Sequence, residues 1–262
     1  MPELIEIEQY RQHLDGLVGQ TVKAVEVCDV RVVRPKGDPG EHFSTLYGCA
    51  LRRTRRHGKL LLADFGEGDS VIVLGLRFGM TGRLLIDGQS SIRQLEYSSP
   101  RNDPAWDRFK MTIGASSVVL RDQRCLGSVE LEPDVSNLGA EASTITAEEL
   151  TEAFRGRHKA VKAALLDQSI LAGLGNLLAD EALWASGISP LTPVDELTAE
   201  GLDTLASEIR NTVSRLTASG GSNTGESFVA RHRGAVCPRC LGQMSDDLIG
   251  GRRAWWCPAH QR

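Results

Sequence analysis

The heptapeptide Lys162-Ala163-Ala164-Leu165-Leu166-Asp167-Gln168 precedes Leu171-Ala172-Gly173-Leu174-Gly175-Asn176 and Asp180-Glu181-Ala182-Leu183 in the second half of this 262-residue chain. Apolar periodicity predicts helices over 159–167 and 174–186, with a Gly-rich turn between them. Asn176 lies where that turn meets the second helix, and there its amide and the exposed backbone N–H groups can bind a phosphate. The alternative for Asn176 is an ordinary helix cap.

Outward from this stretch, the chain divides into a helical half and a strand-rich half. Further helices are predicted over 147–156 and 198–218, and Thr146 with Glu149 forms a capping-box pair ahead of the first of them. Residues 21–131 predict strands, because 22–27 alternates and short apolar runs follow at 60–65 and 71–74. A helix ending at Gly19 precedes the strands.

The sequence therefore predicts an α+β protein whose N-terminal half is a β-sandwich or barrel. We expect a β-sandwich domain over 1–131, a linker over the acidic stretch 132–145, a helical domain over 146–226 and a separate C-terminal segment over 227–262.

Charge is close to balanced over the whole chain but is sorted locally. Lys and Arg number 30 against 34 Asp and Glu, a formal net charge of −4, so no global basic excess indicates a polyanionic partner. Locally, 52–59 carries five positive charges and no acid. The acidic first residues are unlike a secretory leader, and no apolar stretch approaches the length of a membrane helix, so we expect a cytoplasmic protein, associated with the nucleoid if bacterial.

The last 26 residues hold a predicted metal site. Cys237-Pro238-Arg239-Cys240 and Cys257-Pro258-Ala259-His260 form a CxxC and a CxxH pair separated by 16 residues. Two such turns provide the four soft ligands of a closed, tetrahedral structural zinc site. The intervening 248–256 predicts a hairpin with Arg252 and Arg253 near its turn, where a cation can reach a phosphate.

Several segments together resemble one family, the bifunctional DNA glycosylases that comprise formamidopyrimidine-DNA glycosylase and endonuclease VIII. They are Met1-Pro2-Glu3-Leu4 with Glu6 and Glu8, Arg56-His57-Gly58-Lys59-Leu60-Leu61-Leu62, Gly79-Met80-Thr81-Gly82, and the stretch over 162–183, which is similar to the family's helix-two-turns-helix motif. Gly79–Gly82 is closer to the formamidopyrimidine branch. With the cysteine cluster, the resemblance covers nearly the whole chain in the same order.

The resemblance implies a catalytic N-terminus. Removal of Met1 would make Pro2 a free secondary amine, and α-amino groups titrate far closer to neutrality than Lys. Such an amine can attack C1′ of a deoxyribose. Glu3 is then placed to protonate the sugar ring oxygen, Glu6 to support it, and Lys59 to contact the phosphate at the lesion. Without the resemblance, a Pro-Glu N-terminus would indicate no function, and a single Lys such as Lys59 would be interpreted as a solvent-exposed surface charge.

The remaining implied residues contact DNA. An enzyme acting on a duplex base must flip it out, and something should fill the gap. Met80 is the predicted wedge, although a Met is more often a core residue. The loop Asp122-Gln123-Arg124-Cys125-Leu126-Gly127 contributes two more groups. Arg124 can hydrogen-bond the orphaned opposite base, and Leu126 stands where the family has a Phe. The implied DNA-binding residues are Met80, Arg124, Leu126, Lys162, Asn176 and Arg253. The partner is double-stranded DNA with a damaged base or abasic site, bound by a monomer in a cleft between its halves.

The chain departs from the family pattern in five ways. Ile5 replaces Pro, Cys125 and Leu126 replace an Arg-Phe pair, Leu178 replaces Tyr, His260 replaces a fourth Cys, and only 15 residues separate Gly221 from Cys237. The 8-oxoguanine enzymes carry a longer loop there that closes over the flipped purine. We therefore expect slow excision of 8-oxoguanine relative to formamidopyrimidine or an oxidised pyrimidine.

The sequence thus predicts a DNA-repair glycosylase with lyase activity and one structural zinc ion, cleaving the strand by β- or β,δ-elimination. The alternative is a non-catalytic damaged-DNA-binding protein of the same fold, which would have no use for Pro2, Glu3 and Lys59. A zinc-ribbon adaptor using Trp255 and Trp256 leaves residues 1–82 unexplained.

Overall fold

The computed structural model describes residues 1–36, 38, 41–67, 70–92, 95, 99 and 101–262. The chain forms two compact units. The first comprises Met1–Pro2 and Glu6–Val135, and the second comprises Glu3–Ile5 and Ser136–Arg262. None of the helices built by the described residues combines the length and apolar character that a membrane crossing requires.

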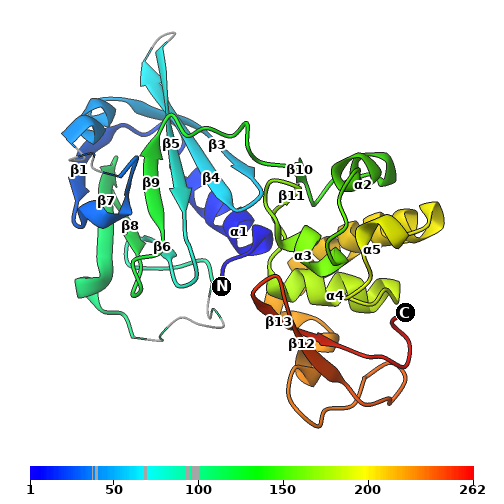
Figure 1. Ribbon diagram of the computed structural model, residues 1–262. Helices are drawn as coiled ribbons and strands as arrows, with labels where there is room; N and C mark the ends of the chain where they lie inside the picture. The colour runs from blue at the N-terminus through cyan, green and yellow to red at the C-terminus, as the bar shows by residue number, and fades with distance from the viewer. Residues whose placement is uncertain (37, 39–40, 68–69, 93–94, 96–98, 100) are drawn as a thin grey trace. The chain divides into compact units, whose positions relative to one another are not determined.

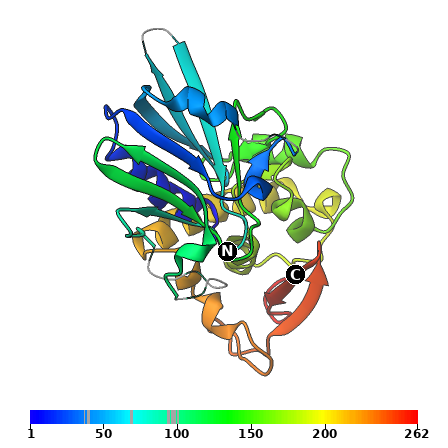
Figure 2. The same ribbon diagram turned by 90° about the vertical axis from the view of Figure 1, so that its left-hand side faces the viewer.

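The first unit is a β-sandwich, as Figures 1 and 2 show. One sheet has the spatial order β1 (Val22–Val27), β7 (Asp107–Ile113), β8 (Ser116–Arg121) and β6 (Arg83–Ile86). The other has the order β2 (Val33–Arg34), β9 (Ser128–Leu131), β5 (Ser70–Arg77), β4 (Leu60–Glu67) and β3 (Ala50–His57). Short 3₁₀ segments are η1 (Val30–Val32), η2 (Glu41–Leu46) and η3 (Pro104–Trp106). All pairings are antiparallel except β2 with β9.

The core of the sandwich follows from side-chain alternation. In β7 every second residue is buried, so Phe109, Met111 and Ile113 point to one face. Helix α1 (Leu4–Asp15) adds Tyr10 and Leu14 to the same core. The predicted sandwich and its preceding helix are therefore confirmed.

The second unit is mainly helical. It contains α2 (Ala147–Phe154), α3 (Val161–Leu166), α4 (Asn176–Ser186) and α5 (Ala199–Ala218), with 3₁₀ segments η4 (Val194–Glu196), η5 (Ser222–Thr224) and η6 (Ser227–Ala230). The predicted capping box is present, because Thr146 Oγ1 accepts from the N–H of Glu149 and the Glu149 carboxylate accepts from the N–H of Thr146. Each predicted helix is found, with ends shifted by one to two residues.

The acidic stretch over 132–145 is only partly a connection. Ala140–Glu141 forms β10, which pairs in parallel with β11 (Leu171–Ala172), and Ala142 and Ile145 are fully buried in the helical core. The predicted linker is therefore too long at its C-terminal end, because its apolar residues are used in packing. Leu4 and Ile5 also belong to the second unit's core, which places the first turn of α1 there.

The chain ends in the predicted hairpin. Strands β12 (Ser245–Ile249) and β13 (Arg252–Trp256) pair antiparallel around Gly250-Gly251, and both glycines have positive φ, as a tight hairpin turn requires. The hairpin, red in Figure 1, packs through β13 against α4.

Candidate functional site

Pro2 is buried at the start of the chain, with Met1 half-buried before it. While Met1 is attached, the Pro2 nitrogen is part of a peptide bond and is not nucleophilic. Glu6, on α1, is only 3% exposed. The side chains of Pro2 and Glu6 are therefore both shielded from solvent.

Glu3 is fully buried and binds the N-terminus of α4. Its carboxylate accepts hydrogen bonds from the N–H groups of Gly175 (2.7 Å), Leu177 (2.9 Å) and Leu178 (3.2 Å). These are donors that the start of a helix leaves without intrahelical partners. Residue 175 must be Gly, because a Cβ there would lie 2.3 Å from Glu3 Cδ. The backbone donors that the sequence analysis assigned to phosphate are thus largely used by Glu3.

Asn176 does not cap the helix, since Gly175 holds that position and Glu3 supplies the acceptor. The Asn176 side chain is half-buried, and its Oδ1 has no hydrogen-bond partner among the described residues. An amide left unsatisfied in this way costs free energy unless a ligand or water pairs with it. The helix-cap alternative for Asn176 is therefore excluded.

The basic run on β3 is largely neutralised within the first unit. Arg53 and Arg55 lie 2.5 and 2.7 Å from the buried carboxylate of Asp64. Burial opposes ionisation of Asp64, but the hydrogen bonds from both arginines outweigh it and lower its pKa. Lys59 is half-buried at the turn between β3 and β4. Its neighbours therefore contribute less free positive charge than the sequence indicates.

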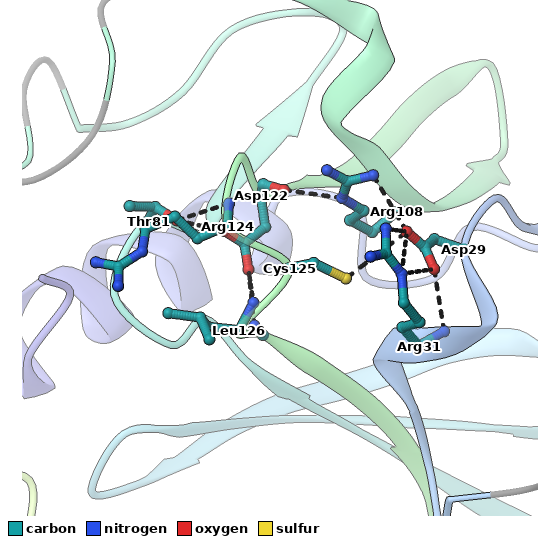
Figure 3. A network of polar contacts seen from close by, with 9 residues as sticks. Asp29, Arg31, Thr81, Arg108, Asp122, Arg124, Cys125 and Leu126 are labelled. Atoms are coloured by element: carbon teal, nitrogen blue, oxygen red, sulfur yellow. Dashed lines mark hydrogen bonds and ion pairs between the residues drawn. The ribbon is translucent and has the colours of Figure 1, made fainter.

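The loop 122–127 folds around one carboxylate, as Figure 3 shows. Asp122 is fully buried and accepts from the N–H groups of Arg124 (3.1 Å), Leu126 (2.6 Å) and Gly127 (2.7 Å). Thr81 Oγ1 also donates to it, which joins this loop to the turn over 79–82. Both loops are thereby held as one rigid piece.

The tips of these two loops are accessible. Leu126 is 47% exposed, and Arg124 is exposed with its Nη1 3.5 Å from Met80 Sδ. Met80 is half-buried, which argues against plain core packing. Gly79 has positive φ, and a Cβ there would lie 2.7 Å from the Leu126 backbone. The predicted wedge residues Met80, Arg124 and Leu126 therefore lie together.

A second carboxylate, Asp29, supports the loop from η1. It pairs with Arg31 (2.6 Å) and Arg108 (3.2 Å), while Arg108 Nε donates to the Asp122 carbonyl at 2.8 Å. The Arg31 hydrogen bond lowers the Asp29 pKa to about 2. The Cys125 thiol lies 3.7 Å from Asp29, and burial followed by this charge raises its pKa. Figure 3 shows these groups side by side.

The prediction that Lys162 contacts DNA is wrong for this structure. Its side chain is fully buried, with Nζ 2.5 Å from Asp180 and donating to the Arg253 carbonyl at 3.0 Å. Burial lowers the Lys162 pKa, against the opposing effect of Asp180. Asp180 also pairs with Arg231 and accepts from the Trp255 N–H at 3.2 Å. Lys162 therefore fastens the hairpin to α3 and α4 and cannot reach a phosphate.

Arg253 lies on the hairpin and is exposed, as a phosphate-binding cation must be. Its guanidinium forms an ion pair with Asp246 across the hairpin. A phosphate would have to compete with this half-buried carboxylate for a guanidinium that is itself exposed.

The four predicted metal ligands converge. The ligand atoms of Cys237, Cys240, Cys257 and His260 all lie within 4.8 Å of one another. The Cys240–Cys257 Sγ distance is 3.5 Å, and His260 Nδ1 is 3.6 Å from both Cys237 and Cys240 Sγ. A tetrahedral ion with ordinary zinc bond lengths needs edges of about 3.6–3.8 Å. The cluster therefore fits a closed metal site.

Trp184 on α4 supports the same cluster. Its Nε1–H donates to Cys237 Sγ at 3.3 Å, and its carbonyl lies 3.3 Å from His260 Nε2. A proton on Nε2, donated to that carbonyl, leaves Nδ1 free to bind a metal. The tertiary structure thus orients both ligands.

Sequence reasoning missed Asp122, Asp29, Asp180 and Trp184. Asp122 had a local signal, because an Asp that opens a short loop often accepts from the following N–H groups. Asp29 had a similar signal, because it accepts from the N–H of Arg31. The Arg108 partner of Asp29, the Arg231 partner of Asp180 and the Cys237 partner of Trp184 lie more than 50 positions away, so no local pattern could identify these contacts.

Comparison with known proteins agrees with this description. A family model for the formamidopyrimidine-DNA glycosylase N-terminal domain matches residues 1–129, and one for the formamidopyrimidine-DNA glycosylase H2TH domain matches residues 138–227. The chain is 31% identical to formamidopyrimidine-DNA glycosylase of Bacillus subtilis, covering 98% of each chain, and 32% identical to that of Paracoccus denitrificans, covering 100% of each. The Lactococcus lactis protein crystallised with DNA containing N7-benzyl-Fapy-dG is 25% identical, with a TM-score of 0.82 and full coverage of both chains.

Proposed function

This chain belongs to the formamidopyrimidine-DNA glycosylase family of DNA-repair glycosylases, and we propose that Pro2 is the nucleophile with which it removes a damaged base and cleaves the strand. The observation that carries the proposal is the burial of Glu3, which follows Pro2 directly and is fixed by three backbone hydrogen bonds at the start of α4. A position fixed in this way favours catalysis over mere binding.

The chemistry requires removal of Met1. The lone pair of the free Pro2 nitrogen attacks C1′ of the deoxyribose, and the N-glycosidic bond breaks as the base leaves with its electron pair and takes a proton from solvent. Ring opening gives an iminium between Pro2 and C1′. The iminium acidifies C2′, so loss of a C2′ proton expels the 3′ phosphate, and a second elimination releases the 5′ phosphate.

Four further residues assist in this proposal. The Glu3 carboxylate takes the proton that the Pro2 nitrogen loses on bonding to C1′ and transfers it to the sugar ring oxygen during ring opening. Glu6, buried on α1, supports the proton transfer, and Lys59 holds the phosphate at the lesion. Asn176, half-buried at the start of α4 and not used as its cap, binds a neighbouring phosphate through its amide N–H.

The two joined loops of the first unit open the duplex. Met80 and Leu126 enter the stack, and Arg124 hydrogen-bonds the orphaned opposite base. The support is their exposure on loops that share the Asp122 carboxylate. Leu126 lacks the stacking of an aromatic, which is worth about 1–3 kcal/mol per base.

The cysteine cluster holds one structural zinc ion in this proposal. Four protein ligands leave no open position, so the metal stabilises the hairpin and takes no part in the reaction. The hairpin presents Arg253 to the phosphates that flank the flipped nucleotide.

The proposed substrate preference is against 8-oxoguanine. The short segment over 222–236 includes η5 and η6 and is fastened to α4 by Glu181, which accepts from the N–H groups of Glu226 (2.8 Å) and Ser227 (3.0 Å). A Cβ at Gly225 would lie 2.5 Å from that carboxylate. A segment held so closely is poorly suited to close over a flipped purine.

The nucleophile is tested by borohydride trapping on duplexes with an abasic site, using protein whose Met1 removal is verified by mass. We expect a covalent adduct with processed protein, none with protein that retains Met1, and a strong loss in Pro2→Gly. Absence of an adduct from correctly processed protein would instead support a non-catalytic DNA-binding protein.

Substrate preference is tested by single-turnover excision on matched duplexes. We expect 8-oxoguanine opposite cytosine to be removed more slowly than formamidopyrimidine or an oxidised pyrimidine. Rapid 8-oxoguanine removal would overturn this part of the proposal and leave the nucleophile assignment intact.

A further inference from the structure

A hollow of about 410 Å³ lies in the first unit beside the loop 122–127, and we call it the η1–β2 hollow. It is lined by Val30, Arg31, Val33, Arg34, Lys36 and Cys125. Three of these residues are cations and none is an acid. Its residues have no part in the catalytic site described above.

The charges around the hollow leave a positive excess. Arg31 and Arg108 share the single carboxylate of Asp29. Asp38, two residues beyond Lys36 and 2.8 Å from His42, is the next acid along the chain. The four cations Arg31, Arg34, Lys36 and Arg108 against these two acids leave two positive charges. An anion entering the hollow therefore meets a net attraction.

Arg34 is held in place for such a contact. Its Nη1 donates to the carbonyls of Arg31 (2.8 Å) and Val33 (2.7 Å). Within the described part of the chain, its Nε and Nη2 make no hydrogen bond to another side chain, so these two donors of the planar guanidinium are available to an anion in the hollow. Val30, 60% exposed at the hollow, adds an apolar surface that suits a sugar.

The position of the hollow relates it to the duplex-opening loop. Cys125 lines the hollow and immediately precedes the exposed tip residue Leu126, and consecutive Cα atoms are about 3.8 Å apart. Cys125 also follows Arg124, which the proposed function directs at the base opposite the lesion. A chain segment that reaches a base from the groove passes close to the phosphates of that base's strand.

Resting on the proposed function, we propose that the η1–β2 hollow binds the phosphodiester backbone of the strand opposite the damaged base, with Arg34 and Lys36 as the main phosphate contacts. Arg31, anchored by Asp29, connects this contact to the loop through Arg108 and Cys125. The undamaged strand is then held at the point where Leu126 enters the stack.

The test uses equilibrium binding of the full chain to a duplex with an uncleavable abasic analogue, measured over a series of salt concentrations. Each lost phosphate contact should reduce the slope of log affinity against log salt by about 0.9. We expect this reduction in Arg34→Gln and in Lys36→Gln. Lys23→Gln, on exposed β1 outside the hollow, makes the same charge change and should leave the slope near the wild-type value.

The strand is identified with single methylphosphonates, which remove the charge of one phosphate at a time. We expect a methylphosphonate at one or two positions of the opposite strand to weaken binding by the wild type. The same substitution should not weaken binding further in Arg34→Gln. Equal slopes for Arg34→Gln and Lys23→Gln would overturn the proposal. Coupling confined to the damaged strand would overturn the strand assignment.

Failure of this inference is distinguishable from failure of the proposed function. Borohydride trapping of the same protein reports on Pro2 alone, whereas the salt slope and the methylphosphonate scan report on the hollow. If borohydride trapping gives an adduct but Arg34→Gln keeps the methylphosphonate sensitivity of the wild type, only the proposal for the η1–β2 hollow is overturned. If Arg34→Gln loses that sensitivity but no adduct forms, the hollow binds DNA in a protein that lacks the chemistry. Thermal melting of Arg34→Gln and Lys36→Gln confirms that each variant is folded.

Discussion

The loop 122–127 and the hairpin formed by β12 and β13 present cations from different units, yet they are held by different chemistry. The loop is organised by Asp122, which accepts three backbone N–H bonds and one from Thr81. The hairpin is held at its ends by the Cys237–His260 cluster and along β13 by Asp180 and Lys162.

The difference explains which sequence departures each region tolerates. Backbone N–H groups are present whatever the side chain, so a loop built on Asp122 accepts Cys125 and Leu126 without losing its shape. A metal site depends on the identity of its ligands, and His260 is acceptable there because an imidazole is also a zinc ligand. The hairpin is therefore chemically stricter than the loop.

Loss of the metal should have the largest effect. Structural zinc contributes apparent binding free energies of about 10–16 kcal/mol in small zinc-dependent folds. In Cys257→Ser we expect metal content near zero, a red-shifted fluorescence from Trp255 and Trp256, and loss of DNA binding. The exposed Cys28→Ser is the control and should keep one metal per chain. An unchanged spectrum in metal-free protein would contradict the prediction.

Breaking the buried ion pair between Lys162 and Asp180, beneath the hairpin, should have the second-largest effect, a loss of unfolding free energy. Lys162→Met leaves Asp180 buried with Arg231 as its one remaining cation partner among the described residues, and removal of one member of a buried pair typically costs about 3–5 kcal/mol. Lys159→Met removes an exposed pair with Asp167 and should cost less than about 1 kcal/mol. Chemical denaturation measures both, and equal costs would show that Lys162 is not a support.

Removing the carboxylate of the loop should cost less, about 2–3 kcal/mol, because charged acceptors contribute about that much. Asp122→Asn loses the oxygen that accepts from Leu126 and Gly127. Its duplex complexes should show reduced unstacking of 2-aminopurine opposite the lesion. Asp103→Asn, which removes one exposed cap on η3, should leave the fluorescence unchanged.

The smallest effect should be the pH dependence from Asp29. Its pKa is lowered from an ordinary value of 3.8 to about 2, first by the Arg31 hydrogen bond. A lowered pKa means that its stabilisation is present above pH 3.8 and is lost as pH falls through 2. We expect Asp29→Asn to lose about 1 kcal/mol at pH 6, after screening by solvent, and to match the wild type near pH 2. A pH-independent difference in unfolding free energy would contradict this.

Much of the candidate site could be predicted from local patterns. The CxxC and CxxH pairs predicted which four candidate metal ligands come together, because each pair is set by a tight turn. The Thr146–Glu149 capping box was likewise a local property. Lys162 failed because burial depends on what packs over a helix, and β13 comes from 90 residues later in the chain. The use of α4 donors by Glu3 spans 172 to 175 positions and had no local signal.

The sequence by itself determined the helix and strand pattern, the metal ligands, and the accessible tip residues Met80, Arg124 and Leu126, because periodicity, ligand spacing and Gly-flanked turns act over a few residues. Only the tertiary structure decided that Lys162 is internal, that Glu3 occupies the start of α4, and that Asp29 supports the loop through Arg108. Those assignments depend on which buried charges find partners, and a partner brought by folding from a distant segment leaves no trace in the local sequence.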